Sequence, residues 1–340
     1  MAVNIANALA NNGLESHICA TRQEGSLKAK LSLEVKYLFL NKKNALDLKA
    51  LKKLVQYIKS NEITIIHAHA TSYFTAFLVK LRLPKVRIVW HDHYGYSENL
   101  KQRKKIPLTF VSITFETVIS VNNNLYHWAQ HHLKAKHFRY LPNFAAFGSA
   151  NPKETKLQGA NEKRIVCLAN LRSQKDHLNL LKAFEIVHKK HKDWTLHLVG
   201  MDFNDVYSEE IKSFRLAHHL DACVFLYGSC SDTQYILVQA SIGVLGSKSE
   251  GLPVALLEYG LAKLAVVVTD VGECGTVVNN MENGLVVPPV NEEVLAEALV
   301  FLIENEIQRK EFGENLYVKV GLNYSENTYI TQLIAIYNLE

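Results

Sequence analysis

Two glutamates flank the start of a helix pattern in the second half of the chain, in the run GSKSEGLPVALLE that begins at Gly246. Pro253 suits the first position of a helix, because its missing N–H group would have no partner there in any case. The free N–H groups and dipole of a first helical turn attract an anion, and Gly251 lets a ligand approach the backbone closely. The run therefore predicts a phosphate site, although a surface turn that only caps a helix would show the same residues.

Glu250 and Glu258 are too far apart to be the acid and base of a glycosidase. Eight residues of helix rise about 12 Å, whereas the carboxylates of a glycosidase lie about 5–9.5 Å apart. We therefore expect separate roles. Glu250 would reach a sugar ahead of the helix, and Glu258 would bind hydroxyls farther along the ligand, such as a ribose diol. The alternative for Glu258 is a solvent-facing position.

Histidines occur in three close pairs that could suggest a metal site: His67 and His69, His91 and His93, His131 and His132. Zinc is bound by such imidazoles, commonly together with cysteine. The spacings alternate across a strand, and no cysteine accompanies the pairs. We therefore expect no metal.

The elements that must position these residues alternate along the whole chain. Strands are expected at 16–19, 35–40, 63–67, 87–91, 118–121, 164–168, 195–199, 224–227, 242–245, 265–269 and 285–287. Helices are expected at 47–59, 72–81, 124–133, 177–191, 253–262, 292–305 and 328–337. Such alternation predicts βαβ units and parallel sheets, hence an α/β fold that binds ligands at the carboxyl ends of its strands. A linker is expected at 141–151, between two prolines.

Length and composition fit a globular protein of two domains. The 340 residues exceed what one core usually supports. With 48% apolar and 21% charged residues, a disordered, collagen-like or coiled-coil chain is excluded. No stretch of 18 apolar residues occurs, and the first residues do not have the pattern of a signal peptide. Five dispersed cysteines fit a reducing cytosol, so we expect a cytoplasmic protein.

The charge is distributed unevenly. Residues 1–150 contain 21 Lys and Arg against 8 Asp and Glu, and the remainder contains 17 against 25. A basic half favours an anionic partner. The densest basic cluster stands beside an apolar step: Lys101, Arg103, Lys104 and Lys105 precede Ile106, Pro107, Leu108 and Phe110. This step suits an anionic membrane surface, with a solvated loop as the alternative. No nucleic-acid motif accompanies the charge, so that partner is not expected.

Two widespread nucleotide-binding motifs do not occur. No Gly-x-Gly-x-x-Gly follows an early strand, and there is no Gly-x-x-x-x-Gly-Lys-Ser/Thr loop. A dinucleotide-dependent dehydrogenase is therefore not expected. Nucleotide binding would have to use the helix start that follows Gly251.

Several motifs together resemble the retaining glycosyltransferases of family 4, which have the GT-B fold. In the second half these are VCLANLRSQKDHLNLLKAF, WTLHLVG, SEGLPVALLEYG, VVVTDVGE and NGLVVPP, and in the first half HAHATSYF and RIVWHDHYG. The resemblance implies two Rossmann-like doubly wound domains that face each other across a cleft. The acceptor-binding domain would span 1–142 and the nucleotide-sugar-binding domain 143–322, and a helix within 323–340 would cross back.

The resemblance implies roles for the residues around the helix start. Glu250 would contact the donor hexose and orient it, and Glu258 would bind the ribose hydroxyls. The backbone of Gly251, Leu252 and Pro253 would lie along the sugar and the diphosphate. The donor would be a substrate, and no cofactor or metal is implied.

The leaving diphosphate would be neutralised by cations of the loop at 170–175. Lys175 matches the loop lysine of the family. The partner arginine of the family stands where this chain has Asn170, and Arg172 would substitute for it. Fixed cations stabilise the charge that develops on a departing phosphate. His91 matches the histidine near the reacting sugar carbon, with His93 as the competing choice.

Two departures from the family pattern affect the expectation. Thr276 stands where the family commonly has a glutamate near the donor sugar. The family also places a strand and a Gly-Gly loop before the helix that MAVNIANALANNG resembles. That strand would sit centrally in the sheet, and its loss would leave the ladder groups of two neighbours unpaired. We therefore hypothesise that Met1 is internal to a longer product, which an intact mass of 38.5 kDa for the natural protein would refute. A chain that truly began at Met1 would have an unstable first domain and weak or no activity.

Three functions fit these observations. The favoured one is transfer, with retention, of a hexose-type sugar from a nucleotide-activated donor to a glycan or lipid-linked acceptor, in cell-surface polysaccharide synthesis at the inner face of the membrane. In this family, retention is attributed to attack by the acceptor on the same face of the sugar, with no protein nucleophile. The alternatives are a sugar-nucleotide epimerase of the same fold, which needs no acceptor, and a non-catalytic sugar-nucleotide-binding protein.

Overall fold

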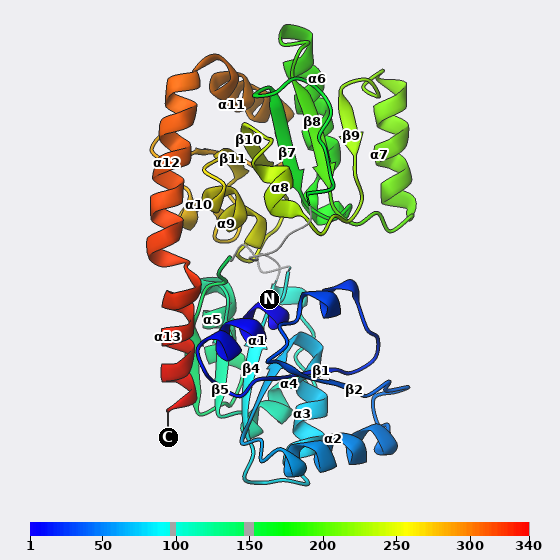
Figure 1. Ribbon diagram of the computed structural model, residues 1–340, viewed down its shortest axis with the longest axis vertical. Helices are drawn as coiled ribbons and strands as arrows, with labels where there is room; N and C mark the ends of the chain where they lie inside the picture. Colours follow the sequence, from blue (N-terminus) through cyan, green and yellow to red (C-terminus); the bar gives the residue numbers. More distant parts are fainter. Residues whose placement is uncertain (96–99, 146–152, 340) are drawn as a thin grey trace. The chain divides into compact units, whose positions relative to one another are not determined.

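The computed structural model describes residues 1–95, 100–145 and 153–339 and divides the chain into two compact units (Figure 1). Unit 1 comprises Met1–Asn143 and Glu326–Glu340, and unit 2 comprises Phe144–Ser325. The boundaries thus fall after 143 and after 325, whereas the sequence suggested 142 and 322. Residues 146–152 of the expected linker lie outside the described residues.

Unit 2 is built on a six-stranded parallel sheet in the order β12-β11-β10-β7-β8-β9. Its strands are β7 (Arg164–Leu168), β8 (Thr195–Val199), β9 (Val224–Leu226), β10 (Ile242–Leu245), β11 (Ala265–Thr269) and β12 (Leu285–Val287). The order is doubly wound and reverses between β7 and β10, where such sheets bind ligands. Five of the six strands have the predicted bounds, and β9 ends one residue early.

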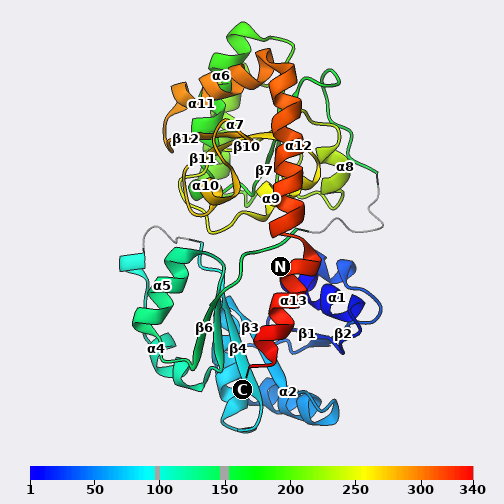
Figure 2. The same cartoon turned by 90° about the vertical axis from the view of Figure 1, so that its left-hand side faces the viewer.

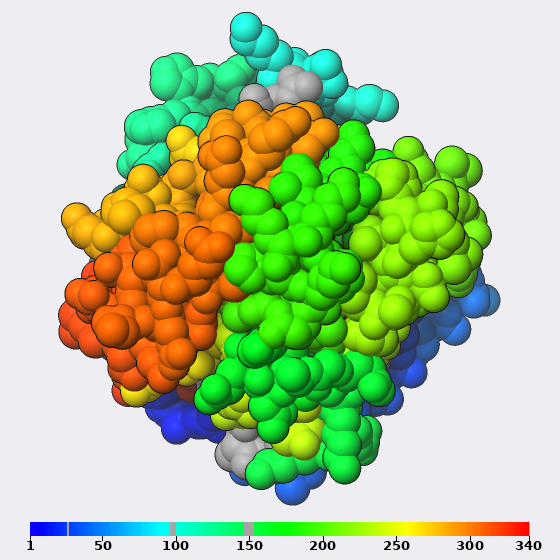
Figure 3. All heavy atoms as spheres, turned by 90° about the horizontal axis from the view of Figure 1, so that it is seen from above, coloured from blue at the N-terminus to red at the C-terminus, as the bar shows by residue number. Residues whose placement is uncertain are grey.

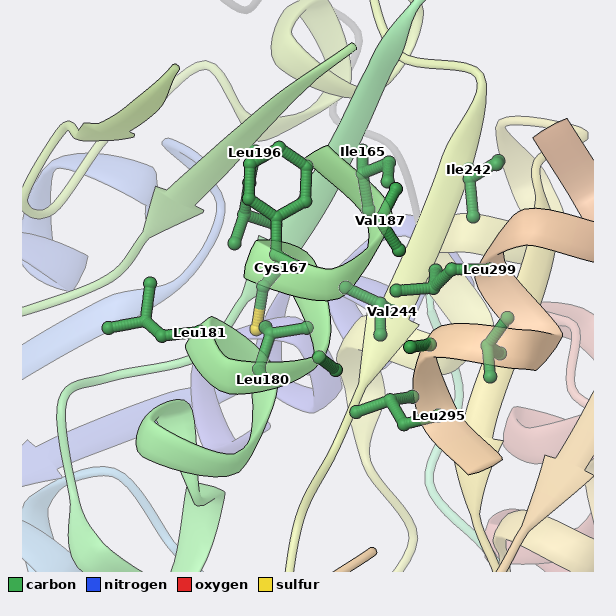
Figure 4. Packing of buried hydrophobic residues seen from close by; sticks show 14 of the residues in the cluster. Ile165, Cys167, Leu180, Leu181, Val187, Leu196, Ile242, Val244, Leu295 and Leu299 are labelled. Carbon is green, nitrogen blue, oxygen red and sulfur yellow. The ribbon is translucent and has the colours of Figure 1, made fainter. Parts of the chain in front are cut away.

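Helices cover both faces of this sheet. They are α6 (His177–Lys190), α7 (Val206–Ala217), α8 (Thr233–Leu237), α9 (Val254–Leu261), α10 (Cys274–Val277), α11 (Glu292–Glu304) and α12 (Glu306–Asn323). α6 lies between α7 and α11 on the face that Figure 3 presents. Figure 4 shows Leu180 and Leu295 reaching from these helices towards Cys167 and Val244 of the sheet. A sheet buried on both faces explains why its strands are continuous apolar runs.

Unit 1 contains two parallel sheets. β1 (His17–Ala20) pairs with β2 (Lys36–Phe39), and the other sheet has the order β3-β4-β5-β6. Its strands are β3 (Ile65–His69), β4 (Arg87–Asp92), β5 (Thr117–Ser120) and β6 (His137–Tyr140). Among the described residues no strand joins the two sheets. β3 runs two residues beyond the prediction, so both His67 and His69 lie on it.

The helices of unit 1 include one from the end of the chain. They are α1 (Ala2–Asn11), α2 (Leu48–Ser60), α3 (Tyr73–Lys80), α4 (Leu108–Val111), α5 (Asn123–His132) and α13 (Glu326–Tyr337). α13 packs against α1, and Figure 2 shows it beside the sheet that holds β3 and β4. Tyr337 of α13 contacts His67 of β3, and Arg87 of β4 donates to the carbonyl of Leu339. The last helix therefore completes unit 1.

In the part of the chain that the structure describes, none of the helices has both the length and the apolar character that crossing a bilayer requires.

Candidate active site

A pocket of about 480 Å³ opens in unit 2 at the carboxyl ends of β7 and β8. Five of the residues singled out from the sequence line it: Asn170, Arg172, Lys175, Pro253 and Glu258. The first three come from the loop between β7 and α6, and the other two from the start of α9. The fold thus brings together segments about 80 residues apart in the sequence, at the switch point where a doubly wound sheet binds its ligand.

Lys175 is held at the pocket by a buried carboxylate. Its Nζ lies 2.6 Å and 2.7 Å from the two carboxylate oxygens of Glu250. Ser247 Oγ donates to Glu250 Oε1 over 2.6 Å. The Glu250 side chain is 6% exposed and the Lys175 side chain 22%. A carboxylate so placed orients the ammonium, and burial strengthens the attraction between them.

Glu250, Gly251 and Leu252 are not among the residues that line this pocket. Glu250 was expected to contact a sugar, and its carboxylate instead bonds Lys175 and Ser247. Leu252 is 4% exposed and belongs to the apolar core of unit 2. The sugar contact of Glu250 and the backbone contacts of Gly251 and Leu252 stay predictions.

The two loops around the pocket are tied together by polar contacts that sequence reasoning missed. The Lys248 N–H donates to the carbonyl of Gln174 over 2.8 Å, and Lys248 Nζ lies 2.9 Å from Asp176 Oδ1. Asp176 has φ +49°, which ends the loop sharply before α6. The signal in the sequence was the Gln-Lys-Asp run at 174–176. The loop that carries Lys175 is consequently fixed to the loop that carries Glu250.

Two glycines let the pocket loops approach their neighbours. A Cβ on Gly200 would stand 2.1 Å from the carbonyl oxygen of Ala169. Gly272 has φ +56°, and a Cβ there would stand 2.3 Å from the carbonyl oxygen of Glu250. The Glu273 N–H donates to the Gly251 carbonyl over 2.9 Å. The turn after β11 therefore supports the backbone on which Glu250 lies.

Arg172 and Asn170 occupy the rim of the pocket in different ways. The Arg172 guanidinium lies 4.7 Å from the centre of the Phe203 ring, a cation–π contact that holds the side chain at the pocket. Asn170 Oδ1 accepts from the Met201 N–H over 2.8 Å and thereby holds the loop after β8. Asn170 thus lines the pocket without a positive charge, and Arg172 with Lys175 supplies the cations.

The start of α9 differs by one residue from the prediction. Pro253 has ψ 120° and is the residue that precedes the helix, so α9 begins at Val254 rather than at Pro253. Glu258 lies a little more than one turn into α9, is partly buried and lines the pocket. Its binding of ribose hydroxyls stays a prediction.

Four histidines meet at the carboxyl ends of β3 and β4 in unit 1. His67 Nε2 lies 3.1 Å from His91 Nδ1, and His69 Nδ1 lies 3.0 Å from His93 Nε2. The Tyr337 hydroxyl lies 2.7 Å from His67 Nδ1. His91 is fully buried, and its Nε2 has no hydrogen-bond partner among the described residues. The role of His91 beside the reacting sugar carbon stays a prediction.

Burial keeps these imidazoles neutral. Burial is the main cause that lowers the pKa of His91 and His67 well below the ordinary value, and the neighbouring histidines add to it. Burial also lowers the pKa of His69 to about 4 and that of His93 to about 3. Ring nitrogens of His67, His69 and His91 lie within 4.8 Å of one another, close enough to hold a metal ion. In this structure the rings bond one another in pairs. The expectation of no metal stays a prediction.

The basic and apolar step at 101–110 divides into buried and exposed residues. Arg103 is buried, and its guanidinium bonds both carboxylate oxygens of Asp92 over 2.6 Å and 2.8 Å. Leu108 is 4% exposed and lies in the core of unit 1. The expectation that these two residues belong to a surface patch is wrong, because the ion pair and the core bury them. Lys101, Lys104, Lys105, Ile106 and Phe110 are exposed, and Ile113 joins them.

Two family models match successive parts of the chain. Residues 1–145 match the model described as Glycosyltransferase Family 4, and residues 151–319 match the model described as Glycosyl transferases group 1. The first match covers the larger segment of unit 1, and the second covers most of unit 2 with its pocket.

Two curated proteins are similar in sequence. An uncharacterized glycosyltransferase of Haemophilus influenzae is 23% identical over 316 residues, which is 90% of this chain and 86% of that protein. The N,N'-diacetylbacillosaminyl-diphospho-undecaprenol alpha-1,3-N-acetylgalactosaminyltransferase of Campylobacter jejuni is 31% identical over 115 residues, which is 34% of this chain and 30% of that protein.

Solved structures share the fold over nearly the whole chain. The Anabaena protein Alr3699/HepE in complex with UDP and glucose superposes with a TM-score of 0.83 at 16% identity, covering 99% of this chain and 95% of that one. A glycosyltransferase from Rickettsia africae superposes with a TM-score of 0.78 at 18% identity, covering 99% and 93%.

Proposed function

Because the chain is a glycosyltransferase with the GT-B fold that resembles family 4, we propose that it moves a hexose-type sugar from a nucleotide-activated donor to a glycan or lipid-linked acceptor, with retention. The observation that carries the proposal is the unit 2 pocket, where Arg172, Lys175 and Glu258 converge and Glu250 fixes the lysine. The pocket combines two cations for a diphosphate with one carboxylate for a diol.

The geometry supports a division of labour within the donor. The diphosphate would lie against Lys175 and Arg172, because fixed cations stabilise negative charge that grows on a leaving phosphate. Glu258 would accept hydrogen bonds from the ribose hydroxyls, since its carboxylate lines the same pocket. The neutral His91 would offer its Nε2 atom to the hexose. The Anabaena neighbour, whose title names UDP and glucose, supports a donor of this class.

The reaction needs no protein nucleophile. The bond between the anomeric carbon and the diphosphate oxygen breaks, and the acceptor oxygen forms its bond on the same face. The acceptor proton passes to the leaving phosphate, whose charge Lys175 and Arg172 hold. Retention follows from attack on the face that the leaving group vacates.

The proposed acceptor and place of action are supported by the exposed residues at 101–110 of unit 1. Lys101, Lys104 and Lys105 are exposed beside the apolar side chains of Ile106 and Phe110. Such a surface suits an anionic bilayer. The protein would therefore work in the cytoplasm at the inner face of the membrane and contribute to cell-surface polysaccharide synthesis. The Campylobacter relative supports a lipid-linked acceptor, because its name includes a diphospho-undecaprenol substrate.

A transfer assay tests the proposal. The purified chain is incubated with UDP-, GDP- and TDP-sugars and with synthetic polyprenyl-diphosphate sugars, and the product is examined by proton NMR. We expect one donor to give a product that keeps the anomeric configuration of the donor sugar. Conversion of a donor without any acceptor would instead favour an epimerase, and donor binding without any turnover would favour a binding protein.

A further inference from the structure

A second pocket, of about 460 Å³, opens in unit 1 and contains none of the site residues expected from the sequence. Its lining comes from the segments that follow β1, β2 and β3, and from Pro107: Thr21, Arg22, Lys42, Ala45, Thr71, Ser72, Phe74, Thr75 and Pro107. These segments meet at the carboxyl ends of parallel strands, the edge at which such folds bind ligands.

The lining of this pocket carries positive charge. Arg22 and Lys42 both line it, and none of the described residues that line it is acidic. Lys42 Nζ lies 2.7 Å from the neutral hydroxyl of Thr75. The carboxylate of Asp47, outside the lining, attracts Lys42 and also accepts from the backbone N–H groups of Ala50 and Lys43. Two cations held in one pocket repel each other, and an anion between them would remove that repulsion.

Burial and the charge of Arg22 lower the pKa of Lys42, and Asp47 opposes this only in part. The charged form of Lys42 is therefore less stable in the free protein than the charged form of a lysine in water. A bound anion would reverse that effect, because opposite charge within a few ångströms favours the charged form.

Hydroxyl groups line the pocket beside the two cations. Thr71 and Ser72 belong to the 3-10 helix Ala70–Ser72, which leads directly into α3, and Thr75 lies in the first turn of α3. Ser72 Oγ donates to the carbonyl of His69, and Thr75 Oγ1 accepts from Lys42. Two cations beside hydroxyl groups suit a phosphate group.

The lining of the pocket is joined in the chain to exposed apolar residues. Pro107, which lines the pocket, follows Ile106 directly, and Ile106 is 85% exposed. Phe110 is 74% exposed and Ile113 66%. A positively charged pocket followed in the chain by exposed apolar side chains matches a ligand with a phosphorylated head and a hydrocarbon tail.

We propose that the pocket of Arg22 and Lys42 binds the phosphate groups of a lipid-phosphate-linked acceptor, with the first part of the lipid lying over Ile106 and Phe110. The inference rests on the proposed function, since it names the chemistry of the acceptor. It makes Arg22 and Lys42 acceptor-binding residues of unit 1, whereas the donor pocket belongs to unit 2.

Titration of the full chain with farnesyl diphosphate, inorganic pyrophosphate and farnesol tests the proposal by calorimetry. We expect farnesyl diphosphate to bind at least tenfold more tightly than either partial ligand. Arg22→Gln and Lys42→Gln should each weaken its binding at least tenfold. Lys43→Gln is the matched control, because Lys43 is exposed and does not line the pocket, and it should bind as the wild type does. Thermal unfolding of each variant checks that unit 1 remains folded.

Three results would overturn the inference. The first is that the double variant with Arg22→Gln and Lys42→Gln binds farnesyl diphosphate as tightly as the wild type. The second is that only Lys175→Gln abolishes this binding, which would place the diphosphate in the donor pocket. The third is that pyrophosphate binds as tightly as farnesyl diphosphate, which would make the ligand a free phosphate rather than a lipid.

Nucleotide binding by the same variants separates this inference from the proposed function. We expect the double variant to bind its nucleotide as the wild type does, because both replaced residues belong to unit 1. Unchanged farnesyl diphosphate binding with normal nucleotide binding would refute only the acceptor site. Failure of the wild type to bind any nucleotide would refute the proposed function itself.

Discussion

Single side chains decide how charge is held in unit 2. Lys175 points its ammonium at Glu250 in the free protein, so a ligand does not meet a freely moving cation. Part of the cost of ordering the lysine is therefore met before a ligand binds. The glutamate that the sequence suggested as a sugar contact is, in this arrangement, the residue that sets the position of the cation.

Replacing Glu250 by glutamine tests this positioning. Glu250→Gln removes the charge that holds Lys175 and keeps the shape of the side chain. We expect sugar transfer to slow about tenfold to hundredfold, or about 1.4–2.7 kcal/mol in the barrier, and unfolding to become easier by about 1–3 kcal/mol. Steady-state rates and urea unfolding measure both effects. Glu297→Gln, at an exposed position, is the control, and equal activity of the two variants would contradict the role.

The buried histidines of unit 1 predict how stability depends on pH. An unfolded histidine binds a proton near pH 6.5, whereas the folded chain lowers the pKa of His69 to about 4 and that of His93 to about 3. Between these values the unfolded state holds more protons, so the free energy of unfolding should fall as the pH drops below about 6.5. It should not change in this way above that pH.

Urea unfolding at pH 7, 6 and 5 measures this dependence. His93→Gln should make the curve flatter, because it removes one group that the unfolded state protonates first. His127→Gln, at an exposed position, should leave the slope as it is. A free energy of unfolding that stays constant or rises between pH 7 and pH 5 would contradict the expectation.

Elements explain why the sequence predicts some parts of the protein better than others. The strands β7, β8, β10, β11 and β12 have their predicted bounds because each is a short apolar run with a sharp end. The predicted strand at 63–67 ends at His67, whereas β3 extends over Ala68 and His69 as well. A polar histidine gives no apolar signal in the sequence, and contacts with other histidines and with Tyr337 half-bury these rings in the fold.

The candidate sites were predictable where one local segment carries them. The loop with Lys175 and the helix with Glu258 show their chemistry in a few consecutive residues. The pairing of Lys175 with Glu250 joins residues 75 apart, which no local pattern reports. The pocket of Arg22 and Lys42 escaped sequence reasoning for the same reason. The available signal was a cation two residues after β1 and three after β2.

Gly272 tests whether the turn after β11 supports the donor pocket. A Cβ there would stand 2.3 Å from the Glu250 carbonyl oxygen, and the φ of +56° is strained for alanine. We expect Gly272→Ala to lower the free energy of unfolding by about 1–3 kcal/mol and to weaken nucleotide binding by displacing Glu250. Gly321→Ala on α12 has open space and should be neutral or slightly stabilising. Denaturant unfolding and calorimetry compare the two variants. Equal free energies of unfolding and equal nucleotide affinities would show that the turn at Gly272 does not support the donor pocket.

The whole molecule divides its charge between its units. The basic residues of 1–150 lie in the half that carries the exposed patch of Lys104, Lys105, Ile106 and Phe110. The acidic half carries the unit 2 pocket, which Arg172 and Lys175 line. A net charge of +5 therefore hides one surface suited to an anionic bilayer and one site suited to an anionic substrate.

Vesicle binding tests the first of these. Phe110→Ser should weaken binding to anionic vesicles about tenfold to hundredfold, since burying a Phe side chain contributes about 1.5–3 kcal/mol. The wild type should also bind less as salt rises. Leu322→Ser on α12, where Leu322 is 70% exposed, is the matched control. Sedimentation with neutral and anionic vesicles measures the difference. Identical vesicle binding by the two variants would show that the exposed patch does not bind the membrane.

Nucleotide binding in unit 2 tests the central claim most directly. Thermal unfolding is recorded with UDP, GDP, ADP, CMP and TDP, for the wild type, for Lys175→Gln and for the exposed control Lys190→Gln. A nucleotide at 100 times its Kd adds about 2.7 kcal/mol, which corresponds to about 5–11 °C in Tm for a domain of this size. We predict that one nucleotide raises the Tm of the wild type and of Lys190→Gln, with a smaller rise for Lys175→Gln. A cooperative transition that no nucleotide shifts would contradict the claim that this pocket holds a nucleotide-activated sugar.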